Sequence, residues 1–149
     1  RVEMAKENLY IAKLEKLLLH LKNAKLSYLK ASDQANSSEK KRFFNHQATE
    51  RNRIFQDILS KLQTLDADFS IQSIRNFNFD QLIISSIKTL KASALQKCLE
   101  ADKALIAIYN EIEALGIEEN FAAHIAKIEL AIEKNAIHLE NIAHKREFY

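Results

Sequence analysis

The sequence predicts an all-α protein in which residues 1–149 form a single antiparallel four-helix bundle. The chain has no proline and one glycine, Gly116, so the residues that interrupt helices most strongly are almost absent. Four segments repeat apolar residues at alternating spacings of three and four, which is typical of helices packed on one face. A length of 149 residues suits one domain with its own hydrophobic core.

The first helix is predicted over about residues 3–31. Its apolar seam, meaning the line of positions that would face the core, contains Tyr10, Leu14, Leu17, Leu21, Ala24, Tyr28 and Ala31. The small and polar residues from Ser32 to Ser38 favour a turn and an N-cap over a helix interior. We therefore expect a short connection to an antiparallel neighbour.

The second helix is predicted over about residues 38–65. Its seam contains Phe44, Ala48, Arg51, Phe55, Ile58, Leu62 and Leu65. Between residues 66 and 78 the helical periodicity lapses, which predicts a long crossover. A short extra helix over about residues 80–91 is expected to lead directly into the third main helix.

The third and fourth helices are predicted over about residues 93–115 and 118–144. Gly116 ends the third helix, because glycine adopts the left-handed C-cap conformation at little cost. The seam of the third helix contains Leu95, Cys98, Asp102, Leu105, Tyr109 and Ile112, and that of the fourth contains Phe121, Ile125, Ile128, Ile132, Asn135, Leu139 and Ile142. Two helical hairpins joined by one long crossover have the connectivity of ferritin-like bundles.

Three seams place a polar residue among apolar neighbours, namely Arg51, Asp102 and Asn135. A buried guanidinium is costly unless a carboxylate pairs with it, and Arg and Asp can form two parallel hydrogen bonds. We predict that Arg51 and Asp102 pair in a buried polar layer with Asn135, which the hydroxyls of Tyr28 and Tyr109 also reach. This layer either fixes the register of the helices or represents the remnant or working variant of a metal or ligand site.

The metal chemistry of a di-iron bundle requires Glu residues on two helices and a Glu-x-x-His motif on each of the other two. The chain contains no Glu-x-x-His motif. After Glu50, Arg53 stands where the motif requires His, and before His138, Asn135 stands where it requires Glu. We therefore expect no catalytic residues and no cofactor. Iron or another divalent metal is the alternative, with Asp102 and His138 as ligands and Glu50 as an outer ligand.

Composition excludes several classes of partner. The net charge of +2 is too small for a nucleic-acid-binding protein, and the longest apolar runs are too short to span a membrane. The single cysteine, Cys98, cannot form an internal disulfide, which favours a reducing cytoplasm. We expect neither nucleic acid nor membrane as a partner, and a cytoplasmic location.

Residues 48–58 resemble the second helix of a bacterial ferritin-like family known only as domain of unknown function 2383. The stretch from Asn23 to Tyr28 is similar to that family's polar segment on the first helix, and His138 falls where the family has a histidine. Cys98-Leu99-Glu100, followed by Asp102 and Tyr109, is similar to its third helix. The resemblance spans about residues 14–142 and implies a ferritin-like fold without an established activity.

The sequence departs from this family at Lys25 and Leu26, where acidic residues are usual, and at Asp102, which replaces a glutamate. These departures reduce any capacity to bind metal. The leading interpretation is a non-enzymatic bundle with a degenerate metal site and a structural or protein-interaction role. The alternatives are a ferritin-like metal-binding or oxidase domain, and a helical module that forms a homodimer or binds a partner through the residues Ile11, Leu18, Leu19 and Leu26.

Overall fold

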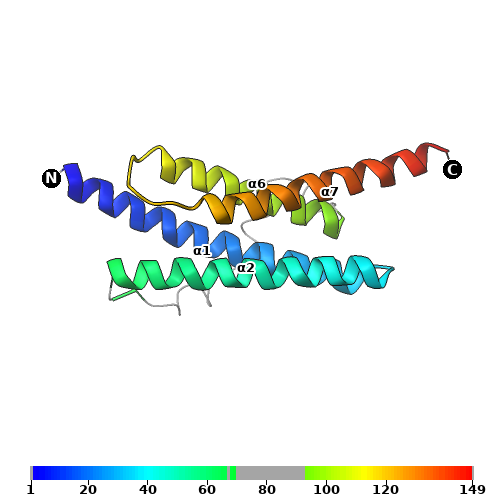
Figure 1. The fold of residues 1–149 in the computed structure, drawn as a ribbon, viewed down its shortest axis with the longest axis horizontal. Helices are drawn as coiled ribbons and strands as arrows, with labels where there is room; N and C mark the ends of the chain where they lie inside the picture. The colour runs from blue at the N-terminus through cyan, green and yellow to red at the C-terminus, as the bar shows by residue number, and fades with distance from the viewer. Residues whose placement is uncertain (1, 67, 70–92, 149) are drawn as a thin grey trace.

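The computed structural model describes residues 2–66, 68–69 and 93–148, and within these ranges the chain is helical and contains no strand. The helices are α1 (Val2–Gln34), α2 (Ser38–Leu65), α6 (Ala94–Glu113) and α7 (Ala122–Phe148). They form a bundle in which α1 packs against both α2 and α6, and α6 packs against α7 (Figure 1). The prediction of an all-α chain is confirmed for this part. The short helix expected at residues 80–91 lies outside the described residues.

The hydrophobic core forms along the predicted seams. All seven seam positions of α1 and all six of α6 are buried. Phe121 just before α7 and Ile128 and Asn135 on α7 are buried, while the seam positions between and beyond them are half-buried. The core face of α1 is wider than the seam, because Leu18 is also fully buried. Leu18 is therefore a core residue, and the expectation that it belongs to an exposed dimer surface is wrong.

Helix α1 extends three residues beyond the predicted end at residue 31. Ser32 is buried at 6% exposure, and its hydroxyl donates a hydrogen bond to the carbonyl oxygen of Lys41 at 3.4 Å. This contact satisfies a polar side chain that would otherwise favour a turn. The connection to α2 is thereby limited to residues 35–37, and the Ser37 hydroxyl caps α2 by accepting from the Lys40 amide at 3.2 Å.

The connection between α6 and α7 is longer than predicted, because α6 ends at Glu113 and α7 begins at Ala122 rather than residue 118. Phe121 is buried outside the helix, with its ring centroid 5.5 Å from that of Tyr109. The amide of Ala122 donates to Oδ1 of Asn120 at 3.0 Å, which satisfies a donor at the helix start. At the other end, α7 continues beyond residue 144 to Phe148.

No helix in the described part of the chain is both long enough and apolar enough to cross a membrane.

Gly116 has a φ of +71°, the only positive φ among the described residues. Substitution with alanine should destabilise the fold by about 1 kcal/mol, because a Cβ is unfavourable in this backbone conformation. Space is not the cause, since the nearest atom to an added Cβ is Nζ of Lys6 at 3.8 Å. Urea unfolding of Gly116→Ala measures the cost, and Gly116→Asn should cost less because asparagine tolerates this conformation. Equal stability of the alanine variant and the wild type would contradict the left-handed backbone conformation of Gly116.

Candidate functional site

A polar layer crosses the centre of the bundle and takes one side chain from each helix. Tyr28 comes from α1, Arg51 from α2, Asp102 from α6 and Asn135 from α7. None of these four residues is more than 1% exposed. Each occupies a seam position, so the helical repeat that directs apolar neighbours into the core also directs these polar groups there. The sequence analysis had named all four.

Arg51 and Asp102 make two parallel hydrogen bonds. Nε of Arg51 lies 2.9 Å from Oδ1 of Asp102, and Nη2 of Arg51 lies 2.9 Å from Oδ2. The Tyr28 hydroxyl also donates to Oδ2, and the Asn135 amide in turn donates to the Tyr28 hydroxyl at 2.8 Å. Two donors from Arg51 and one from Tyr28 therefore converge on the Asp102 carboxyl group, which is the pattern expected for its ionised form.

The electrostatics of the polar layer combine a large burial cost with strong pairing. Burial raises the pKa of Asp102, opposed by the hydrogen bonds from Arg51 and Tyr28. Burial alone would lower the pKa of Arg51, but the hydrogen bonds and charge of Asp102 turn its net shift upward. The pKa of the Tyr28 hydroxyl is raised, chiefly by burial and then by the Asp102 charge. Arg51 therefore stays protonated and Tyr28 stays neutral at physiological pH.

The polar layer has little capacity for chemistry. Both oxygens of Asp102 already accept hydrogen bonds, and the Arg51 guanidinium carbon lies 5.2 Å from the centroid of the Tyr28 ring. Nη1 of Arg51 is buried without a hydrogen-bond partner among the described residues. Burial also raises the pKa of the neighbouring Cys98 thiol, which keeps it protonated and unreactive. No group in the layer is both accessible and poised to exchange a proton or act as a nucleophile.

Tyr109 is buried, but the structure places its hydroxyl in a different network from the polar layer. The hydroxyl lies 3.2 Å from Nδ1 of His124, and Nε2 of His124 lies 3.2 Å from Oδ2 of Asp57. The His124 ring also stacks on Phe121, with a centroid separation of 5.7 Å. The sequence analysis missed His124 and Asp57. Only the offset between α2, α6 and α7 brings them to Tyr109, and no spacing within one helix signals that offset.

The three residues considered as metal ligands do not gather at one site. Asp102 is enclosed by Arg51 and Tyr28. Glu50 is buried near the middle of α2, and Nη1 of Arg53 lies 2.7 Å from its Oε1. His138 is half-buried and lines a cavity near one end of the bundle. Among the residues that the structure describes, no three His, Cys, Asp or Glu side chains gather in a way that could hold a metal ion.

Polar side chains bridge α2 and α7. The backbones of these two helices approach less closely than those of α1 and α2, α1 and α6, or α6 and α7. Nζ of Lys127 lies 3.0 Å from Oε2 of Glu50, and Nζ of Lys61 lies 2.6 Å from Oε2 of Glu119. Together with the contact between His124 and Asp57, these pairs join the α2 side of the bundle to α7 and the residues just before it.

No family model matches the chain, and no curated protein and no solved structure matches it. Its function must therefore be inferred from the chemistry of its own side chains.

Arg51→Leu should destabilise the protein by about 3–5 kcal/mol, because Asp102 would be left as a buried, unpaired carboxyl group. The double variant Arg51→Leu/Asp102→Leu should recover much of this loss, since it removes both charges. Urea unfolding of the two single variants and the double variant measures the coupling free energy. Arg53→Leu is the matched control on the same helix, and it should cost no more than about 1 kcal/mol because the Arg53 side chain is 68% exposed. Additive effects of the two substitutions would refute the pairing.

Glu50 should make stability depend on acid pH. Contact with Lys127 lowers the pKa of Glu50 below its usual value of 4.5, and burial opposes this shift without cancelling it. The resulting stabilisation is fully present above pH 4.5 and is lost as the pH falls through the lower pKa of the folded state. Glu50→Gln should show a smaller loss of melting temperature than the wild type below pH 4.5, and Lys127→Gln should behave similarly. An unchanged pH profile in both variants would contradict this role.

Proposed function

We propose that the chain is a non-enzymatic helical bundle with ferritin-like connectivity, which acts by binding at its surface and not by chemistry in its interior. The single observation that carries this proposal is the polar layer, in which the two oxygens of Asp102 are already bonded to Arg51 and Tyr28. A bundle enzyme needs accessible acids, bases, nucleophiles or metal ligands at its centre. This centre instead has a neutralised and solvent-free ion pair.

Pairs of contacting residues support antiparallel, ferritin-like connectivity. Between α1 and α6, Lys13 pairs with Glu111 and Tyr28 pairs with Asp102. Residue numbers therefore increase along one helix as they decrease along the other, so the two helices are antiparallel. Along α2 and α7, Glu50 pairs with Lys127, and Asp57 with His124. Helix α2 therefore ends at the opposite end of the bundle from the start of α6 (Figure 1). Two hairpins joined by one crossover fit this arrangement.

The charge of the interior supports the loss of metal chemistry. The Arg51 guanidinium lies where a cation would otherwise interact with Asp102, and a second positive charge there would be repelled. Lys25, at a position where the resembled bacterial family has acidic residues, donates to Oδ1 of Asn52 at 3.2 Å. We therefore interpret this region as a degenerate metal site, in agreement with that resemblance. The buried, free Cys98 supports a cytoplasmic location.

Metal analysis tests the proposed function. The purified chain is incubated with Fe²⁺, Mn²⁺ or Zn²⁺, freed of unbound metal by gel filtration and assayed by mass spectrometry, and ferrous oxidation is followed in parallel. We expect far less than one metal ion per chain and oxidation at the rate of buffer alone.

Stoichiometric metal that His138→Gln removes would support the metal-binding alternative and overturn the proposal. Glu140→Gln is the matched control, because Glu140 is exposed on the same helix. Metal lost equally in both variants would identify binding at the surface of α7, away from the polar layer.

A further inference from the structure

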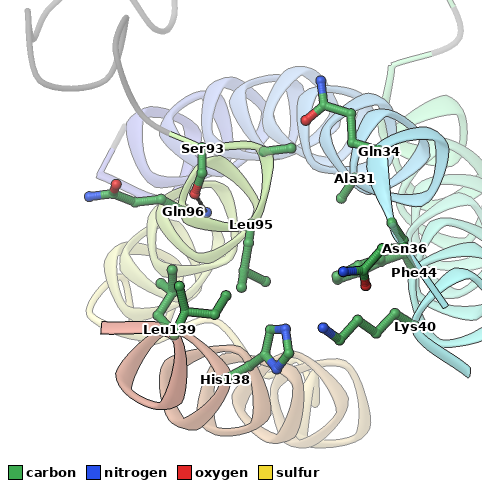
Figure 2. Close-up of a pocket in the computed structure, with 13 residues that line it drawn as sticks. Ala31, Gln34, Asn36, Lys40, Phe44, Ser93, Leu95, Gln96, His138 and Leu139 are labelled. Carbon is green, nitrogen blue, oxygen red and sulfur yellow. Dashed lines mark hydrogen bonds between the residues drawn. The ribbon is translucent and has the colours of Figure 1, made fainter. Parts of the chain in front are cut away.

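A cavity of about 720 Å³ opens near one end of the bundle (Figure 2). It is bounded by the end of α1, the first turns of α2 and α6, and the second half of α7. The volume is within the range typical of pockets that bind small molecules. It lies apart from Arg51 and Asp102, neither of which lines it.

The wall of the cavity combines apolar and polar side chains and draws on all four helices. Its apolar side chains are Ala31, Phe44, Leu95, Leu139 and Ile142, together with Ala35 and Ala94. Phe44 and Leu95 also pack in a buried cluster with Tyr28, Ala31, Ala48 and Cys98, so this wall is continuous with the hydrophobic core. An apolar group that entered here would be removed from water.

The polar groups of the cavity favour a negative charge. Lys40 and His138 point into the opening from α2 and α7 (Figure 2), and none of the lining residues is Asp or Glu. Lys40 is half-buried and makes no ion pair within the described residues. An anionic ligand that entered the cavity would therefore act as the counter-ion of this amine.

The start of α6 adds a second source of positive potential. Ser93 caps this helix, and it lines the cavity together with Ala94, Leu95 and Gln96 of the first turn. The Gln96 amide already donates to the Ser93 hydroxyl oxygen at 3.2 Å, so the amides of Ala94 and Leu95 supply the positive potential. The amides at the start of a helix lack intrahelical acceptors and carry a partial positive charge. Gln34 and Asn36 add amide groups at the opposite wall. The helix start and Lys40 thus favour the same charge from different sides of the cavity.

We propose that this cavity binds a small organic anion with an apolar body, of the class of medium-chain carboxylates. The carboxylate would lie between Lys40 and the start of α6, and the hydrocarbon chain would lie along Phe44, Leu95 and Leu139. An adjoining cavity of about 420 Å³ shares Lys40, Phe44 and His138 but also contains Glu39, so it is the less suitable place for the anionic head. The inference deepens the proposed binding function and rests on it.

Titration with sodium octanoate tests the inference. Amide chemical shifts of ¹⁵N-labelled full-length chain are followed by NMR, below the concentration at which octanoate forms micelles. Saturable shifts should be confined to residues around the cavity, Leu95 and Leu139 among them. The uncharged analogue 1-octanol should bind at least about tenfold more weakly, because it retains the apolar body but cannot pair with Lys40. Acetate should cause no saturable shift, because it lacks the apolar body.

Three variants locate the site. Lys40→Gln should weaken octanoate binding about tenfold. Lys41→Gln, which changes the same charge at an exposed neighbouring position outside the cavity, should leave binding unchanged. Ala35→Phe should abolish binding by filling the cavity, and circular dichroism checks that the variant folds. If it does not fold, the comparison of Lys40→Gln with Lys41→Gln locates the site.

Three results would overturn the inference: no saturable shifts at the cavity, equal binding of octanoate and octanol, or equal effects of the two lysine substitutions. None of these results depends on metal content. Failure here therefore remains distinct from failure of the metal analysis.

Discussion

The buried ion pair between Arg51 and Asp102 is the interaction on which the rest of the bundle depends. An unpaired charge at this depth would cost several kcal/mol, so any packing that separated the two residues would be strongly disfavoured. Tyr28 and Asn135 extend the pair to the remaining helices through hydrogen bonds. A rotation or shift of one helix would leave at least one of these groups buried without a partner. The polar layer thereby selects one register among apolar seams that could otherwise slide past one another.

The same layer determines where function can reside. Both oxygen atoms of Asp102 accept hydrogen bonds, and the four residues of the layer are enclosed by the core, so they are not exposed to a ligand in solution. Accessible chemistry is found elsewhere, at the polar bridges between α2 and α7 and at the end cavity beside Lys40. In the proposed function, a ligand would bind at these accessible positions and leave the core undisturbed.

Much of the fold could be predicted because seam residues follow a simple helical repeat. The pairing of Arg51 with Asp102 was also predictable, since two opposite charges in apolar seams have few other ways to be buried. Tyr109 and His124 show the limit: their contact depends on the relative offset of α6 and α7, which no single helix encodes. Helix α7 begins later than predicted, at Ala122 and not at residue 118, because the tertiary burial of Phe121 outweighs local helix propensity. The cavity depends on four helix ends meeting, which sequence periodicity does not report.

Hydrogen exchange at the Nε–H of Arg51 tests the central claim most directly. The proton is buried and bonded to Oδ1 of Asp102, so its exchange in ¹⁵N NMR should require opening of the whole bundle. Its protection should then correspond to the free energy of global unfolding. Arg53, two residues along the same helix with a side chain that is 68% exposed, provides the internal reference for unprotected exchange. Exchange at Arg51 as fast as at Arg53 would contradict the account, because the layer could not then fix the register of the helices.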